Sequence, residues 1–443
     1  MAIQLSDHFT YKKILRFCFP SIVMMIFTSV YGVVDGLFIS NFVGKVPFAA
    51  INLVMPFIMI IGGIGFMIGT GGSAWVAKTL GEGNREGANR YFTMMVEFTV
   101  ICGVFFSVLG ILFMRPVCLF LGATDAMLED CVVYGTIALA FNTSFMMQSL
   151  FHTFFTTAEK PKLGLAATVA AGVANMALDA LFIVVFKWGV AGAALATGLS
   201  ECIGGFLPLI YFARPNGSLL RLAKTRLEVK ILWKACTNGS SELMTNISGS
   251  LVSMLYNFQL LRFAGENGVA AYGVLMYIQF IFIAVYIGYT IGTAPVVGYH
   301  YGAGNHGELK SLLQKSMVLM GVTGFLMMVT ARALAAPLSN IFVGYDTELF
   351  EMTKYAFQIF SFSFVLSGIN IFTSSFFTAL NNGGVSAAIS FLRTLVFQMF
   401  SVLVLPMIWG LNGIWWAIAV AEVFAFLISL TFLFVKRKKY HYM

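Results

Sequence analysis

Charged side chains are scarce in this 443-residue chain, of which they make up 10%, against roughly 25% in an ordinary soluble domain. So few charges cannot cover a water-exposed surface of this size, which excludes a typical soluble enzyme, a disordered chain and a nucleic-acid-binding module. Cysteine is also sparse, and the six cysteines form no CxxC pair and no metal-binding spacing. Cys118 and Cys131 flank a predicted outer loop. They are the one pair for which the sequence leaves open whether a disulfide bond forms.

Catalytic and nucleotide-binding motifs are missing as well. The sequence has no HExxH, no GxSxG and no metal cluster. Its two glycine-rich loops, GEGN at 81–84 and GAGN at 302–305, lie between apolar segments and lack the lysine–serine pair of a phosphate-binding loop. We therefore expect no enzymatic activity, no direct use of ATP and no cofactor.

Apolar residues are what the sequence has in abundance, at 59% with a mean hydropathy of +0.87. A membrane-spanning helix needs about 20 consecutive, mostly apolar residues. Twelve stretches meet this length: 12–39, 47–77, 91–114, 127–156, 162–186, 189–212, 235–262, 269–299, 311–334, 347–379, 384–408 and 411–435. The sequence therefore predicts an all-α polytopic membrane protein with twelve transmembrane helices.

Basic residues fall mainly on one side of this predicted topology. Twenty lysines and arginines lie at the two ends of the chain and in alternate connections, against five in the remaining connections. Because cytoplasmic loops collect lysine and arginine, both termini are expected in the cytoplasm, with the protein in the cell membrane.

An internal repeat runs through the chain at an offset of about 221 residues. Gly81-Glu82-Gly83-Asn84 falls on Gly302-Ala303-Gly304-Asn305, Trp188-Gly189 falls on Trp409-Gly410, and Glu201 falls on Glu422. Each half holds six predicted helices, an even number, so the halves have the same orientation. The sequence thus predicts two parallel six-helix bundles related by a pseudo-two-fold axis along the membrane normal. The predicted lobes are residues 1–212 and 235–443, joined by a basic cytoplasmic linker at 213–234.

Ionisable groups within the predicted spans are candidates for function because burying them in a membrane is costly. Asp35 lies late in the first span, Asn175 and Asp179 share one face of the fifth, and Thr197 lies in the sixth. Oxygen atoms of this kind suit a sodium ion, or a proton shared between carboxyls. The second half carries Tyr256, Val396, Phe400 and Ile418 at the matching positions. A requirement of the fold alone would act on both halves, so the asymmetry favours a functional cluster over structural hydrogen bonding.

Other polar residues in the spans admit both a structural and a functional interpretation. Glu201 and Glu422 occupy matching places and suit packing or gating, while Arg393 needs a partner, for which Glu422 is a candidate. Glu242 is a candidate second site for a proton or a drug. The candidates for lining a cavity are Gln148, Tyr256, Asn257, Gln279, Met147 and Met276, all of which also occur as ordinary membrane-helix residues.

The pattern resembles the multidrug and toxic compound extrusion (MATE) family over essentially the whole chain. The resemblance is carried, in this order, by VVDGLFISNFVG (33–44), IGTGG (68–72), LGEGN (80–84), NMALD (175–179), WGVAGAALAT (188–197), VAAYG (269–273) and IGTAPVVGYHYGAGN (291–305). It implies export of organic, often cationic, drugs in exchange for sodium ions or protons. Asp35, Asn175, Asp179 and Thr197 match the cation site of the DinF-type branch, and Glu242 resembles the helix-7 acid of the NorM-type branch.

The resemblance leaves the coupling ion open between sodium and proton. The expected mechanism is alternating access by rocking of the two lobes, in a chain that we expect to be a monomer in the lipid bilayer. Two alternatives remain: a flippase for lipid-linked oligosaccharides, which would need arginine and lysine side chains along its cavity, and a membrane sensor or scaffold that transports nothing.

Overall fold

Helices build nearly all of the protein. The computed structural model describes residues 3–442, apart from the side chain of Lys45, and every regular element in that range is helical. The first half contains α1 (Tyr11–Phe42), α2 (Lys45–Gly81), α3 (Arg85–Leu112), the short α4 (Met114–Phe120), α5 (Leu128–Thr157), α6 (Pro161–Asp179) with a π-helical turn at Ala180–Val185, and α7 (Gly189–Ala213).

The second half repeats this plan with more interruptions. It contains α8 (Val229–Gly302), α9 (His306–Val343), α10 (Thr347–Phe360) continued through a 3₁₀ turn (Ser361–Ser363) into α11 (Phe364–Ala379), α12 (Gly383–Phe391) continued through a π-helical turn (Leu392–Val396) into α13 (Phe397–Trp409), and α14 (Leu411–Tyr440).

The prediction of twelve membrane spans is confirmed. In residues 3–442, ten helical segments are long and apolar enough to cross a membrane. One of them, α8, has 74 residues and a break at Gly265, where φ is 62° and ψ is −151°. At about 1.5 Å per residue it is far too long for one crossing, so it supplies two spans. The twelfth span is α5, which is 30 residues long but carries more polar side chains.

The backbone itself shows the internal repeat. Glycines with a positive φ angle recur in matching pairs. The φ angle is 121° at Gly44 and 62° at Gly265, 81° at Gly83 and 66° at Gly304, and 56° at Gly189 and 58° at Gly410. Each pair is 221 residues apart, the offset found in the sequence. The same turns therefore connect the same helices in both halves.

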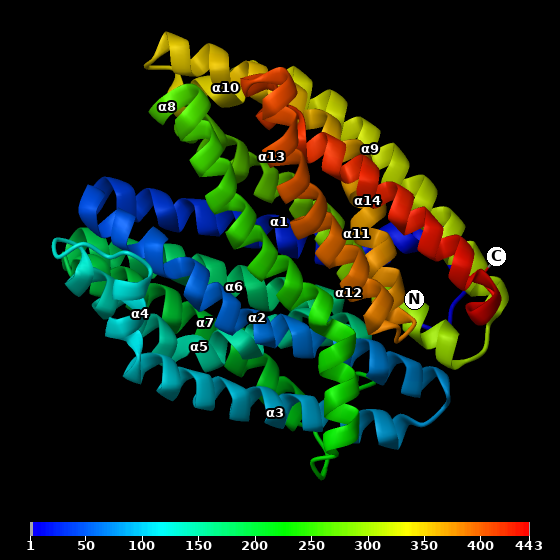
Figure 1. Cartoon of the computed structure of the whole chain (residues 1–443). Helices are drawn as coiled ribbons and strands as arrows, with labels where there is room; N and C mark the ends of the chain where they lie inside the picture. The colour runs from blue at the N-terminus through cyan, green and yellow to red at the C-terminus, as the bar shows by residue number, and fades with distance from the viewer. Residues whose placement is uncertain (1–2, 443) are drawn as a thin grey trace.

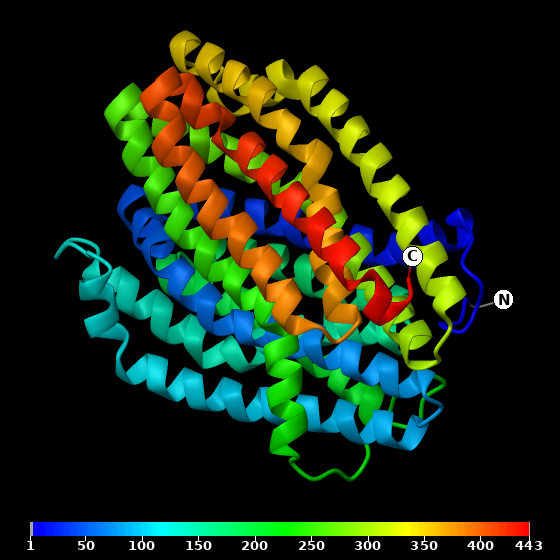
Figure 2. The same cartoon turned by 45° about the vertical axis from the view of Figure 1, so that its right-hand side comes forward.

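The two halves form separate bundles that share a core at one end. Figure 1 shows the first half, blue to green, beside the second half, green to red, and Figure 2 shows both termini at the same end of the molecule. At that end a single buried cluster contains Phe17 and Phe92 from the first half with Tyr286 and Phe372 from the second. Each half also has its own buried cluster, one around Tyr134 and one around Phe357.

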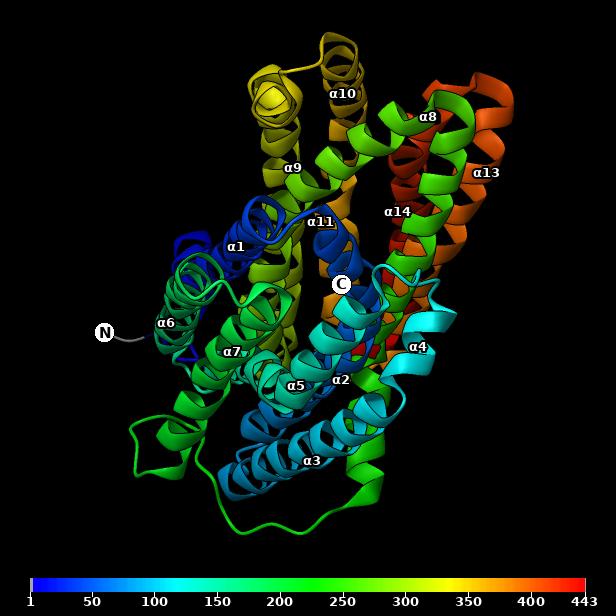
Figure 3. The same ribbon diagram turned by 90° about the vertical axis from the view of Figure 1, so that its left-hand side faces the viewer.

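The seam between the halves runs where α1 and α2 pack along α8, and Figure 3 shows α1 and α2 on the side of the first bundle that faces the second. Glycines allow close approach there. A Cβ atom on Gly239 of α8 would meet the backbone carbonyl of Met67 of α2, and one on Gly292 would lie 2.6 Å from the Cys18 sulfur of α1. The helices thus meet backbone to backbone, as small residues permit in membrane proteins.

The non-helical connection between the halves lies inside the predicted linker. α8 begins at Val229, so residues 214–228 join the bundles, where the sequence suggested 213–234. The connection is held against α3: the Arg221 amide donates to Asn89 Oδ1 at 2.9 Å and the Ala223 amide donates to Thr93 Oγ1 at 2.9 Å. Lys230 and Lys234, which belong to the predicted linker, lie on exposed positions of the first turns of α8.

The cysteine pair that the sequence left open is not joined in the structure. Cys118 of α4 and Cys131 of α5 are both buried free thiols, and the Cys131 thiol donates to the carbonyl of Ala50, with the sulfur 3.6 Å from that oxygen. The segment between them is also not a simple loop, since α4 forms its first part.

Candidate functional site

The predicted cation cluster lies where α1, α6 and α7 pack together in the first half. Asp35 is on α1, Asn175 and Asp179 are in the last turn and a half of α6, and Thr197 is on α7. The carboxyl groups of Asp35 and Asp179 lie close enough to interact electrostatically, and no hydrogen bond joins them. The π-helical turn begins directly after Asp179. Such turns are frequent at functional sites because they re-aim side chains within a helix.

The oxygen atoms of this cluster have no protein partner. Asp35 Oδ1, Asn175 Oδ1, both carboxylate oxygens of Asp179 and Thr197 Oγ1 are buried without a hydrogen bond. Asn175 and Asp179 are at most 1% exposed. Buried polar groups in native proteins are nearly always satisfied, and an unsatisfied one is costly. Carboxylate, amide and hydroxyl oxygens are suitable ligands for a hard cation, and two facing carboxyls can also share a proton. The residues present therefore fit either ion.

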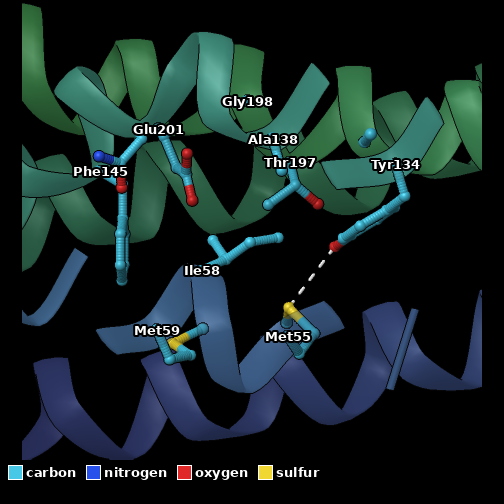
Figure 4. Close-up of a pocket in the computed structure, with 11 residues that line it drawn as sticks. Met55, Ile58, Met59, Tyr134, Ala138, Phe145, Thr197, Gly198 and Glu201 are labelled. Carbon is cyan, nitrogen blue, oxygen red and sulfur yellow. Dashed lines mark hydrogen bonds between the residues drawn. The ribbon is translucent and has the colours of Figure 1, made fainter. Parts of the chain in front are cut away.

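A small cavity lies beside this cluster, between α2, α5 and α7. It has a volume of about 40 Å³, which exceeds the roughly 10–15 Å³ that one water molecule requires. Figure 4 shows Thr197 and Glu201 reaching toward it from α7, with Met55 and Met59 on the opposite wall. The Tyr134 hydroxyl closes one side and lies 3.7 Å from Met55 Sδ. The cavity is thus lined by one carboxyl group, a few neutral polar groups and soft apolar side chains.

Two polar residues of this cavity, Tyr134 and Asn142, were not singled out from the sequence. They lie on α5 with Ala138 and Phe145, at spacings of four, four and three residues. That spacing places them on one helix face, which is the sequence signal that identifies them. Asn142 is 1% exposed and its Oδ1 has no hydrogen-bond partner, while its Nδ2 meets only the sulfur of Met146 at 3.5 Å.

The residues predicted to line a cavity lie elsewhere in the described part of the chain. Gln148 and Met147 are buried in the first half, and Tyr256 is buried in the second half, stacked on Tyr272 with ring centroids 4.9 Å apart. Asn257, Gln279 and Met276 are half-buried on α8. All six are outside the cavity of Figure 4. Glu242, the candidate second site, is half-buried on the first arm of α8 and is also outside it.

Arg393 and Glu422 form a buried ion pair in the second half. Arg393 Nε lies 2.9 Å and 3.0 Å from the two carboxylate oxygens of Glu422, and its terminal nitrogen lies 2.7 Å from one of them. Asn370 Nδ2 donates to the same carboxylate at 2.7 Å, and Ser429 donates to Asn370 Oδ1 at 3.1 Å. Every charge in this network is therefore paired, in contrast to the cluster in the first half.

A protein-family model and several known proteins match this chain over most of its length. The MatE family model matches residues 20–181 and 243–403, once in each half of the chain. The multidrug export protein MepA of Staphylococcus saprophyticus is 22% identical over 435 residues, covering 97% of this chain and 94% of that protein. MepA of Staphylococcus aureus is 20% identical over 434 residues, with the same coverage of 97% and 94%.

Solved structures share the fold. One, described as the outward-facing conformation of a multidrug resistance MATE family transporter of the MOP superfamily, aligns with a TM-score of 0.93 at 21% identity, covering 100% of this chain and 99% of that one. A MOP superfamily transporter from Pyrococcus furiosus, whose description reports a binding pocket of reverse polarity and suggests a different function, aligns with a TM-score of 0.88 at 22% identity, covering 97% of each chain. The fold is thus common to transporters whose binding pockets differ.

Proposed function

The chain belongs to the MatE family, and on that premise we propose that it is a secondary active transporter that exports small organic, often cationic, compounds in exchange for sodium ions or protons. The relatives named as multidrug export proteins support the substrate class. The buried, unsatisfied oxygens of Asp35, Asn175, Asp179 and Thr197 support the exchange with a cation. That set of oxygens is the single observation on which the proposal depends.

The proposed coupling follows from the charge of the cluster. Without a cation, two carboxyls from α1 and α6 face each other in a region of low dielectric constant, where like charges repel strongly. A bound sodium ion or proton removes this repulsion and draws α1 toward α6. An ion that binds one arrangement of the helices more tightly than the other shifts the equilibrium between them. If the drug prefers the opposite arrangement, each ligand drives the release of the other.

Efflux by the Asp35→Asn variant tests the proposal. Asparagine keeps the size of the side chain and removes the charge, so we expect gradient-driven efflux of a cationic dye from proteoliposomes to fall at least about tenfold. The matched control is Asp125→Asn, which removes an exposed acid from a connection and should leave efflux unchanged. Sodium and proton gradients are imposed separately, so that the coupling ion is identified. Undiminished, gradient-dependent efflux by Asp35→Asn would falsify the assignment.

The flippase alternative lacks the basic side chains that it requires. Arg393 and Lys354 are the two basic residues that the sequence places within spans. Arg393 is paired with Glu422, and Lys354 lies 3.0 Å from a carboxylate oxygen of Glu351. Binding a lipid-linked diphosphate would require both cations to leave their partners, so the described residues favour exchange of organic cations.

A further inference from the structure

Glu201 and Glu422 occupy matching places in the two halves but have opposite electrostatic surroundings. Glu422 is held by Arg393 and Asn370, as described above. Glu201 takes part in no ion pair or hydrogen bond within residues 3–442, and it faces the small cavity of Figure 4. The repeat thus supplies an internal comparison: the same acid is neutralised in one half and left without a countercharge in the other.

The first half has no room for the missing arginine. At offsets of 221 or 222, which the flanking helices show, Arg393 falls on Gly172 or Ala171 of α6. A Cβ atom on Gly172 would already meet the ring of Phe27, and it would lie 2.9 Å from the ring of Tyr31, both on α1. The side chains of α1 therefore leave no room for a larger side chain at position 172, which matches Arg393 at the offset of 221. Position 172 thus cannot supply a countercharge to Glu201 while α1 packs in this way.

The surroundings of Glu201 offer neutral oxygen ligands. Asn142 Oδ1 and Thr197 Oγ1 belong to residues that line the same cavity, and both atoms are buried without a hydrogen-bond partner. The cavity, at about 40 Å³, is too small for an organic drug and large enough for a small ion or water. A carboxylate together with an amide oxygen and a hydroxyl oxygen is a donor set for a small cation, and water in the cavity would complete its shell.

The carboxyl groups of Asp35, Asp179 and Glu201 have no basic side chain within residues 3–442 to balance their charge. Asp35 and Asp179 already face each other, and Asp35 also lies within electrostatic range of Glu201. No lysine or arginine pairs with any of the three in the described part of the chain. We infer that Glu201, with Asn142 and Thr197, forms a second site for one small positive charge, a sodium ion or a proton. The proton would come from bulk water and form an O–H bond on the Glu201 carboxyl.

Thr197 connects the two sites. It belongs to the predicted cluster with Asp179, and it lies one helical turn from Glu201 on the same face of α7. Filling one site would thus change the ligands available to the other. The inference rests on the proposed function only in taking sodium ions and protons as the exchanged cations.

Counting bound cations tests the inference. The purified full-length protein is titrated with radioactive sodium, and its proton uptake is measured by potentiometric titration in sodium-free buffer. We expect Glu201→Gln to bind one positive charge fewer per chain than the wild type in the sodium arm or in the proton arm, which identifies the ion. The matched control is Glu266→Gln, which removes an exposed acid from α8 and should lower the proton count only in the range of an exposed carboxyl.

A second variant keeps the test decisive where Glu201→Gln does not fold. Asn142→Ala retains the carboxyl and removes a neutral ligand, so we expect roughly tenfold weaker binding of the second cation with an unchanged count. A folded Glu201→Gln protein with wild-type counts and affinities in both arms overturns the inference, as does unchanged affinity in Asn142→Ala. Failure of the proposed function is distinguishable from failure of this inference. In that case the wild type shows no dye efflux, while the titrations still give the expected number of bound cations.

Discussion

At the scale of single residues, the molecule treats its buried charges in two ways. Glu422 is 2% exposed and Arg393 is 12% exposed, and their contact is completed by Asn370. Asp35 and Asp179 are left to face each other. A buried pair gives little net stability over an apolar pair of the same size, but removal of one partner leaves an uncompensated charge. Stability should therefore depend on the network in the second half.

Removing the charge of Glu422 should destabilise the protein. In Glu422→Gln the Arg393 guanidinium keeps its burial and loses its counter-ion, so we expect the free energy of unfolding to fall by about 3–5 kcal/mol. Thermal unfolding of the detergent-purified protein measures it. Glu351→Gln breaks the more exposed pair with Lys354 and should cost only about 0–1 kcal/mol. Equal melting of the two variants would contradict the prediction, and combining Glu422→Gln with Arg393→Met should restore part of the loss.

The residues of the candidate site differ in how readily a sequence reveals them. Acids within spans stand out because nothing in a membrane interior explains an unpaired carboxyl, which is why Asp35, Asp179 and Glu201 were singled out. Asn142 did not stand out, because an amide is tolerated on many membrane helices. Its importance comes from its Oδ1, which is buried without a hydrogen-bond partner. Only three-dimensional packing determines whether that atom has a partner.

At the scale of helices, hydropathy and charge predict which segments are helical. Packing determines where those helices are kinked or interrupted. Twelve spans and the repeat were predictable because each depends on local composition or on self-similarity. The continuity of α8 through Gly265 and the π-helical turn at Leu392–Val396 were not, since both depend on neighbouring helices. The turn at Leu392–Val396 contains Arg393 itself, so the position of Arg393 relative to Glu422 depends on packing that the sequence does not specify.

Helix approach at the seam gives a prediction at this scale. A methyl group at Gly239 would meet the backbone carbonyl of Met67, which cannot rotate away, so α2 and α8 must separate. We expect Gly239→Ala to lower the free energy of unfolding by about 1–3 kcal/mol, the usual cost of overpacking. Thermal unfolding again measures this. Gly249, ten residues along the same helix, has nothing within 4 Å of its Cβ position, so Gly249→Ala should be neutral or slightly stabilising. Equal melting temperatures of the Gly239→Ala and Gly249→Ala variants would show that α2 and α8 accommodate the methyl group without loss of stability.

At the scale of the whole molecule, the two halves are joined at the end that carries both termini. Residues 3–10 cross this end as a non-helical segment with a turn at residues 5–7 before α1. The Leu5 amide donates to Glu159 of the first half at 2.6 Å, and the Phe9 amide donates to Glu308 of the second half at 2.9 Å. His8 Nδ1 lies 2.7 Å from the other carboxylate oxygen of Glu308. In a transporter that alternates between two arrangements of its halves, contacts that bridge them favour the arrangement in which they form.

Weakening this bridge should therefore open the end that it closes. Glu308→Ala removes the buried hydrogen bond from the Phe9 amide, worth about 1.5–3 kcal/mol, and the contact with the exposed His8, which contributes little. The open population should therefore rise roughly tenfold or more. Cys18 reports the change, because it is 1% exposed and packed against Gly292 of α8. In a protein whose other cysteines are replaced by alanine, we expect faster maleimide labelling of Cys18 in Glu308→Ala. The matched control is Glu86→Ala. Glu86 is an exposed acid in the first turn of α3, just as Glu308 lies in the first turn of α9, and its removal should leave the rate of Cys18 labelling unchanged. Equal labelling in both variants would mean that the seam between α1, α2 and α8 holds this end closed without help from the terminal segment.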